Sequence, residues 1–371
     1  MKKVLLSIIL MASAQLLQAT VWTVSFDTRP AQFTNLQTAI DSASAGDTVL
    51  INGYQSGWNP TYLRKPLVLM GEKFDEPSNQ SNNNTTNPYP RTRIYQLVLG
   101  RVNSYTGASG SRIYGLDIDY LYLNPDFSGG QWGEKALDDV IVERCKIERA
   151  TFYTASGANW FSNITFRNSV FTNNISGLYN NAGQVQHSIT LFTNCVFSNA
   201  YLTGNSSYSL NGQVLVRNSV FIDRTANNCF SNINGVIVEN NIFYRSEPGG
   251  CTDCTYNNNL TYNCLDNTLP PSSGNSVGSG NIEQVDPQWL NYPPQGNVAW
   301  TQYHDYSSSA GSPVLGTGTN GTNIGLMGGS APVANVPVHP KNPEVIEVDI
   351  PVSSVPAGGT LQINLKAKTR D

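Results

Sequence analysis

The chain has 371 residues and a net charge of −4, and only 13% of its residues are charged, against about 25% in a typical soluble domain. Glycine, proline and tyrosine are plentiful, with 32, 20 and 18 residues. This composition excludes a mostly helical protein, and the lack of a basic excess argues against nucleic acid as a partner. We expect an all-β chain with many tight turns.

Residues 1–19 have the pattern of a secretory signal peptide. Lys2 and Lys3 precede an apolar run over residues 4–17, and Ala19 follows it. That run is shorter than the roughly 20 residues that a membrane-spanning helix needs. We expect cleavage after Ala19, with residues 12–14 as a competing site, and an exported protein that does not span the membrane.

A short amphipathic helix is predicted within residues 31–45, just before a strand-like segment at 48–51. Such a helix would cover the open end of a stack of strands. Its apolar positions have helical spacing: Phe33, Leu36, Ala39, Ile40 and Ala43.

A repeat runs through the middle of the chain. Four segments share the pattern Asn-x-Val/Ile-Phe at intervals of 22 to 26 residues, each after a short apolar run. This period, without a helical pattern, predicts a β-solenoid whose coils stack about 4.8 Å apart. The repeats begin at Asn168, Asn194, Asn218 and Asn240, and residues 115–118 and 144–147 extend the series backward.

Aligned coils give columns of equivalent residues. One column is large and apolar and is expected to face the interior; two residues earlier, a column of mostly small residues contains Cys145 and Cys195. These two cysteines would lie two coils apart, roughly 9–10 Å, which is too far for a disulfide. We expect both to be buried thiols. The apolar column consists of Ile118, Ile147, Phe171, Phe197, Phe221 and Phe243.

The repeated asparagines are expected at a sharp corner, because asparagine tolerates the left-handed backbone region. We expect their amides to bond to the asparagines of the coils above and below. Just before them, Glu143 would pair with Arg167, and Arg217 with Glu239, as opposite charges on adjoining strands do. The residues two positions after the asparagines would form an outward apolar stripe that needs a cover from a loop, the tail or a partner: Val170, Val196, Val220 and Ile242.

Four further cysteines are the candidates for disulfides: Cys229, Cys251, Cys254 and Cys264. Four cysteines allow three pairings, and their spacing does not choose among them. A zinc site at the Cys251-x-x-Cys254 motif is the alternative. Export and the absence of a nearby histidine favour disulfides.

The predicted organisation is a signal peptide (1–19), a parallel β-helix domain (20–330) and a proline-rich linker with a C-terminal β-strand tail (331–371). Within the domain, residues 75–93 are interpreted as a polar loop insertion and 265–310 as a loop-rich end. In the tail, alternating apolar residues predict two half-buried strands.

Residues 33–51, the coils over 118–243 and the segment 311–329 resemble the pectate-lyase-like, right-handed parallel β-helix superfamily, and within it exported bacterial β-helix repeat proteins without an assigned activity. The resemblance implies the fold. It does not choose an activity, because this fold carries lyases, hydrolases, esterases, adhesins and phage tailspikes. Of the polygalacturonase-type elements only an Asp138-Asp139 pair is present. The three histidines form no cluster and are expected on the surface or in loops: His187, His304 and His339.

One dense group of charges falls on the outward positions of two adjoining coils: Asp117, Asp119, Lys146, Glu148 and Arg149. In this alignment Asp117 lies over Lys146, and Asp119 lies beside Glu148. The group could be an exposed ion pair, worth about 0–1 kcal/mol, a sugar or Ca²⁺ site, or a catalytic site. Ca²⁺ wants six to eight oxygens, of which Asp119 and Glu148 supply only a start. No other cofactor is implied.

Aromatic residues near this group in the sequence offer stacking surfaces for sugar rings: Tyr114, Tyr120, Tyr122, Trp132, Tyr153 and Trp160. We therefore expect a protein that binds a polysaccharide or a surface glycan on its flat faces. The alternative is a polysaccharide lyase for a uronate-containing glycan, with Lys146 as the base and Arg149 neutralising the carboxylate.

Overall fold

The computed structural model describes residues 19–53, 55, 59–74, 91–101, 107–126, 135–152, 159–181, 185–293 and 299–337, and the backbone of 343–349 and 364–369. The predicted signal peptide lies outside the described residues, apart from Ala19. In the described part of the chain, no helix is long and apolar enough to cross a membrane.

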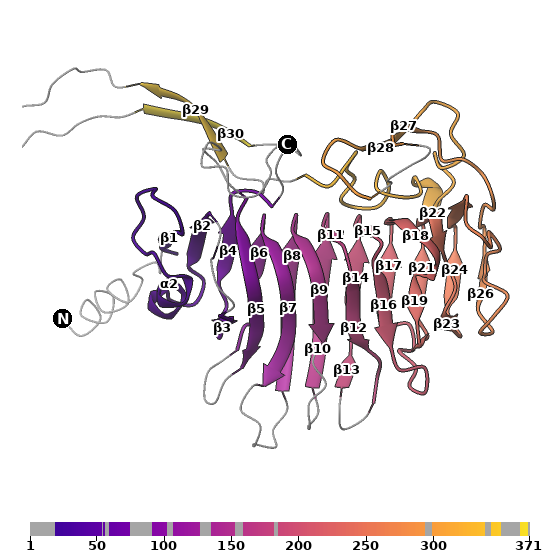
Figure 1. Ribbon diagram of the computed structural model, residues 1–371, viewed down its shortest axis with the longest axis horizontal. Helices are drawn as coiled ribbons and strands as arrows, with labels where there is room; N and C mark the ends of the chain where they lie inside the picture. Colours follow the sequence, from indigo (N-terminus) through magenta and orange to yellow (C-terminus); the bar gives the residue numbers. More distant parts are fainter. Residues whose placement is uncertain are drawn as a thin grey trace, which may run out of the picture.

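The chain forms a right-handed parallel β-helix, in which each strand pairs with the equivalent strand of the next coil (Figure 1). The first face is a 12-stranded parallel sheet. Its strands are β1 (Val21–Ser25), β2 (Thr48–Asn52), β4 (Val68–Gly71), β6 (Arg112–Tyr114), β8 (Lys135–Glu143), β10 (Asn159–Arg167), β13 (Val185–His187), β14 (Thr190–Thr193), β17 (Val214–Arg217), β21 (Ile237–Glu239), β24 (Thr255–Asn257) and β26 (Val277–Ser279).

The second sheet is also 12-stranded, and at β9 it divides between two strands of the next coil. The first half of β9 pairs with β11 and the second half with β12. Its strands are β3 (Thr61–Leu63), β5 (Arg93–Arg101), β7 (Asp117–Asp126), β9 (Lys146–Phe152), β11 (Val170–Phe171), β12 (Asn174–Leu178), β15 (Val196–Ser198), β16 (Tyr201–Gly204), β18 (Val220–Asn228), β19 (Phe230–Ser231), β22 (Ile242–Glu247) and β25 (Leu260–Tyr262). A small sheet pairs β20 (Ile233–Asn234) with β23 (Cys251–Thr252).

The predicted capping helix is present as α2 (Leu36–Ser42). The Asn35 side chain accepts a hydrogen bond from the Thr38 N–H and so caps the first turn. Leu36, Ala39 and Ile40 are buried against the first strands. The sequence pattern missed β1, which precedes the helix and forms the first strand of its sheet.

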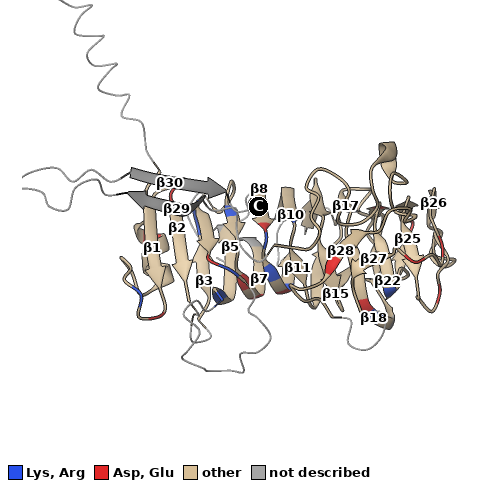
Figure 2. Cartoon of the chain, turned by 90° about the horizontal axis from the view of Figure 1, so that it is seen from above, with Lys and Arg blue, Asp and Glu red and all other residues tan. Residues whose placement is uncertain are grey.

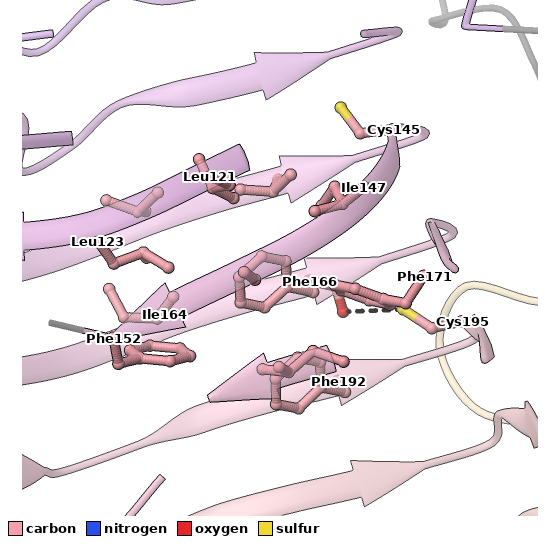
Figure 3. Close-up of a cluster of buried hydrophobic side chains, with 14 of the residues drawn as sticks. Leu121, Leu123, Cys145, Ile147, Phe152, Ile164, Phe166, Phe171, Phe192 and Cys195 are labelled. Carbon is pink, nitrogen blue, oxygen red and sulfur yellow. Dashed lines mark hydrogen bonds between the residues drawn. The ribbon is translucent and has the colours of Figure 1, made fainter. Parts of the chain in front are cut away.

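The predicted interior column is confirmed, and Ile94 extends it by one coil. All its members are fully buried. Phe171, Phe197, Phe221 and Phe243 stack face to face, with ring centroids 5.2, 4.4 and 4.7 Å apart. Figure 3 shows part of this core, where rings of both sheets point toward one another.

The small-residue column carries hydrogen bonds inside the coil. Cys145 and Cys195 are buried free thiols, as predicted, and burial raises the pKa of each to about 12. Their backbone N–H groups donate to the hydroxyls of Ser169 and Ser219 on the next coils. Further along, asparagines replace the serines and form an amide ladder: Asn241, Asn259 and Asn281.

The corner asparagines adopt the left-handed conformation, as predicted, with φ between 46° and 57°. The prediction that their amides bond to one another is wrong. Asn194 donates to the carbonyls of Leu326 and Gly328 at 2.9 and 2.8 Å, and Asn240 accepts from the Thr319 N–H at 2.9 Å. Asn194, Asn218 and Asn240 therefore hold the C-terminal part of the chain.

The outward stripe is confirmed, and residues 286–293 and 299–337, which we call the cover, pack on it. Val170, Val196 and Val220 are fully buried there beside Trp300 and Leu326. In Figure 1 the orange segment with β27 (Trp289–Asn291) and β28 (Asp305–Ser308) lies along the upper edge of the later coils. A short 3-10 helix, η1 (Thr319–Gly321), contacts the corner.

Strand boundaries differ from the predicted loop regions at two places. β5 begins at Arg93, inside the predicted insertion, and β26 continues the first sheet within the predicted loop-rich end. The tail contains the two predicted strands, β29 (Pro343–Asp349) and β30 (Asn364–Thr369), as an antiparallel pair. Both predicted charge pairs are present: Glu143–Arg167 at 2.6 Å and Arg217–Glu239 at 2.8 Å.

Candidate functional site

Three adjoining strands, β5, β7 and β9, share one pattern. They begin Arg-Ile-Tyr-Gln-Leu, Asp-Ile-Asp-Tyr-Leu and Lys-Ile-Glu-Arg-Ala, and they pair in parallel register. The second and fifth residues belong to the hydrophobic core, and the first, third and fourth lie outside it. The charged and aromatic residues among these, with Arg91 and Tyr122 added, form what we call the charged patch: Arg91, Arg93, Tyr95, Asp117, Asp119, Tyr120, Tyr122, Lys146, Glu148 and Arg149.

Two carboxylates of the charged patch are paired with arginines. Arg93 binds Asp119 through two nitrogens, Nε to Oδ1 at 2.8 Å and Nη2 to Oδ2 at 2.6 Å. Arg91 Nη1 lies 3.0 Å from Asp117 Oδ2. The predicted register of Asp117 with Lys146 is confirmed, but Asp117 is buried and not exposed as expected. Both aspartates are only 6% exposed, because guanidinium groups N-terminal to β7 in the chain pair with them.

Burial raises the pKa of Asp117 to about 6, and the cations Lys146, Arg91 and Arg93 oppose this rise. Asp119 adds to it as a like charge. Asp117 therefore changes from largely neutral to largely ionised over roughly pH 5 to 7. The charged patch carries more negative charge above this range than below it.

The three candidate residues of β9 all lie on the outward face. Lys146 is half-buried, whereas the side chains of Glu148 and Arg149 are 43% and 45% exposed and lie 3.8 Å apart. Arg149 also lies over the ring of Tyr120, with Cζ 5.5 Å from the centroid. Lys146 and Arg149 are thus two cationic groups on one strand, about 10 Å apart along it.

Tyrosine rings border these cations. Tyr95 meets Tyr120 edge to face with centroids 5.3 Å apart, and Tyr120 and Tyr122 are parallel with centroids 6.3 Å apart. The remaining aromatic candidates are not in this group. Tyr114 and Trp160 lie on the other sheet, in β6 and β10, and the predictions for Trp132 and Tyr153 lie outside the described residues.

Sequence analysis missed Arg91 and Arg93, because both fall in the predicted insertion. A signal was available, since residues 93–99 have the same alternation of buried and outward positions as β7 and β9. Thr92 holds the start of β5 in the coil. Its hydroxyl donates a hydrogen bond to the Ile51 carbonyl and accepts one from the Glu72 N–H.

A groove of ≈ 840 Å³ lies on the other side of the corner from the charged patch. Tyr114, Glu143, Arg144 and Arg167 line one wall, and residues 330–335 of the cover line the other. Tyr114 and Glu143 each stand three residues before the first residue of β7 or β9, so only the corner separates the groove from these strands. We call this groove the corner groove.

Arg144 occupies the corner position that asparagine takes in the later coils, with φ of 52°. A residue other than Gly, Asn or Asp is uncommon in this region, and such conformations gather at functional sites. Its guanidinium Nε lies 3.9 Å from Glu143, and the side chain is 3% exposed. The corner groove is therefore lined by an arginine whose backbone conformation is uncommon for this residue type.

No three His, Cys, Asp or Glu side chains among the described residues come together in a way that could hold a metal ion. Of the cysteine candidates, Cys251 and Cys254 form a disulfide. Cys229 and Cys264 are buried free thiols. The zinc alternative at the C-x-x-C motif is not supported, since both of its sulfurs are in the disulfide.

Figure 2 shows blue and red segments side by side at β5 and β7, in the half of the β-helix away from β27 and β28. The outward column changes from charged to apolar between Lys146 and Val170, which is where the cover begins. The polar outward residues therefore lie on the coils that precede those packed against the cover.

Comparison with known proteins gives similarity in fold. No protein-family model and no curated protein matches the chain. A solved alginate lyase from Paenibacillus sp. str. FPU-7 is 16% identical with a TM-score of 0.39, covering 71% of this chain and 95% of that one. AlyGC, a PL6 family alginate lyase, is 14% identical with a TM-score of 0.36, covering 71% of this chain and 40% of its own. The strand pairing of the chain itself shows a parallel β-helix fold.

Proposed function

We propose that this is an exported protein that binds an acidic, uronate-containing polysaccharide on the corner groove and the charged patch. The proposal rests on a change of residue type along one outward column of the β-helix. Covered coils have valine or isoleucine there, whereas the adjoining coils have Asp117 and Lys146. Export rests on the pattern of residues 1–19, a prediction from the sequence.

The chemistry of this surface suits a carboxylated sugar chain. Arg149 and Lys146 offer charge-assisted hydrogen bonds to carboxylates, and Tyr120 and Tyr122 offer ring faces to the apolar side of a sugar. In the corner groove, Arg167 lies near Tyr114 as a part-exposed cation that is paired with Glu143. A chain passing around the corner would meet cations on both sheets.

Removing Lys146 tests this proposal. We expect Lys146→Ala to weaken binding of polymannuronate or polygalacturonate by about 1–3 kcal/mol, because a contact to a carboxylate is lost. Binding should weaken further as salt rises, since charges are screened over about 8 Å at physiological ionic strength. Calorimetric titration at two salt concentrations measures both effects. Arg217→Ala, which removes one cation from an ion pair on a distant coil, is the matched control. Equal affinities of wild type and Lys146→Ala would refute the site.

The titration of Asp117 predicts that uronate binding depends on pH. Its pKa is raised to about 6, so the patch gains negative charge as pH rises through this value. Uronate binding should therefore be stronger at pH 5 than at pH 7.5, by about 3- to 10-fold. Asp117→Asn keeps the patch in its neutral form and should bind at pH 7.5 as the wild type does at pH 5. A pH dependence that persists in this variant would assign it to another group.

A second candidate function is β-elimination at the same site, and the placement of Lys146 and Arg149 on one face of β9 favours it. Arg149 would neutralise the uronate carboxylate while Lys146 removes the proton at C5. The electron pair would form the C4–C5 double bond, and the glycosidic bond at C4 would break as its oxygen takes a proton, with the Tyr120 hydroxyl as a nearby donor. Ultraviolet absorbance of the unsaturated product distinguishes cleavage from binding, and binding without this absorbance would exclude the lyase.

A further inference from the structure

A second hollow lies at the opposite end of the strands from the cover. Its volume is ≈ 450 Å³, within the range of roughly 300–1,000 Å³ typical of ligand pockets. It is formed where the chain turns into β13 and β17, and Figure 1 places β13 at the lower end of the coils. Its lining residues are Asn180, Gln186, His187, Ser207, Tyr208, Ser209, Asn211 and Gln213.

The wall is rich in hydrogen-bonding groups and has no Asp, Glu, Lys or Arg among its lining residues. His187 is buried, although it was expected on the surface or in a loop. It is 4% exposed and packs on Phe152 and Phe161. One ring nitrogen meets the Thr190 hydroxyl and the other the Gly177 carbonyl. Burial lowers the pKa of His187 to about 4, so the hollow is uncharged at neutral pH.

Several lining side chains keep their polar atoms available. In the described part of the chain, no hydrogen bond is made by the side chains of Gln186, Asn211 or Gln213, or by the Tyr208 hydroxyl. Gln186 and Gln213 are half-buried and Asn211 is exposed. A side-chain amide can both donate and accept hydrogen bonds, as a sugar hydroxyl can, so the two groups suit each other.

Aromatic rings flank these amides. Tyr208 is 38% exposed and stacks on Tyr179, with ring centroids 6.0 Å apart. Trp160 is 42% exposed and lies in register beside Gln186 on the adjoining strand. An exposed tryptophan next to a free amide offers both an apolar ring face and a hydrogen-bonding partner to one sugar unit.

We propose that this hollow, with Trp160 at its edge, is a second carbohydrate site that takes a neutral sugar unit. It differs from the charged patch in chemistry, since amides and rings replace ionic groups, and it lies at the other end of the strands. The inference does not depend on the proposed binding of an acidic polysaccharide.

Titration with neutral hexasaccharides tests the site. Cellohexaose, mannohexaose and xylohexaose are added to the protein while tryptophan fluorescence and heat are recorded. We expect at least one to bind and to change the fluorescence, because Trp160 would be covered. Trp160→Ala and Gln186→Ala should each weaken that binding about 10-fold or more, and Trp160→Phe should abolish most of the fluorescence change.

Two controls separate this site from the charged patch. Tyr303→Ala removes an exposed aromatic ring on the cover and should leave binding unchanged. Lys146→Ala, and about 0.5 M salt, should also leave it unchanged, because no ionic contact is involved. Binding by none of the three hexasaccharides at about 10 mM, or unaltered binding by both the Trp160 and Gln186 variants, would overturn the proposal. Neither result would bear on uronate binding.

Discussion

Phe197→Ala should lower the free energy of unfolding by about 3–5 kcal/mol, the usual cost of truncating a buried phenylalanine. Phe197 is fully buried. Its ring lies between Phe171 and Phe221, with centroids 5.2 and 4.4 Å away, and also faces Phe192 from the other sheet. The cavity would open in the middle of a stack, where neighbouring coils are fixed by their own backbone pairing and cannot collapse into it.

Urea denaturation of wild type and variant measures the effect. Phe197→Leu retains most of the volume and should cost less than about 1.5 kcal/mol. Tyr303→Ala removes an aromatic ring of similar size from an exposed position and should be nearly neutral. If Phe197→Ala unfolds at the wild-type urea concentration, the ring does not contribute to the core as the packing indicates.

The ladder to which Phe197 belongs could be predicted from the sequence because it is a local, repeated feature. Each coil places one large apolar residue two positions after a small one, so the same alignment predicts the ladder, the corner and the register of Asp117 with Lys146. The charge pairs Glu143–Arg167 and Arg217–Glu239 follow from that register alone.

Contacts between segments distant in the sequence could not be predicted in this way. The amides of Asn194 and Asn240 were expected to bond along their column, yet their partners lie more than 75 residues away in the cover. A period of 22 to 26 residues gives information on the next coil only. The sequence indicated that the outward valines need a cover, but not which segment supplies it.

Contacts in the charged patch were also only partly predictable from the repeat. Asp117, Asp119, Lys146, Glu148 and Arg149 were aligned correctly, but the alignment placed no partner on the preceding coil. Arg91 and Arg93 come directly after a polar stretch without the repeat pattern, so their coil was interpreted as a loop. Because they pair with Asp117 and Asp119, they change these two carboxylates from exposed to buried groups.

The second large effect is expected inside the coil, at Asn259. Its side chain is fully buried and accepts from the backbone N–H and the amide of Asn241, while its own amide donates to Val238 and Asn281. Asn259→Ala would leave the Asn241 N–H buried without an acceptor, and part of the neighbouring amide as well. Each such group costs about 1–3 kcal/mol, so we expect about 2–4 kcal/mol in urea denaturation.

The earlier coils supply the matched control. At the same position they carry Ser169 and Ser219, whose hydroxyls accept the backbone N–H of the preceding coil at 3.2 and 3.1 Å. Asn259→Ser should therefore restore the acceptor for Asn241 and recover about half of the stability lost in Asn259→Ala. Equal losses in the two variants would mean that side-chain volume matters there and hydrogen bonding does not. A buried donor without a partner costs free energy, so an Asn259→Ala protein with wild-type stability would show that the ladder does not contribute to stability as its hydrogen bonds indicate.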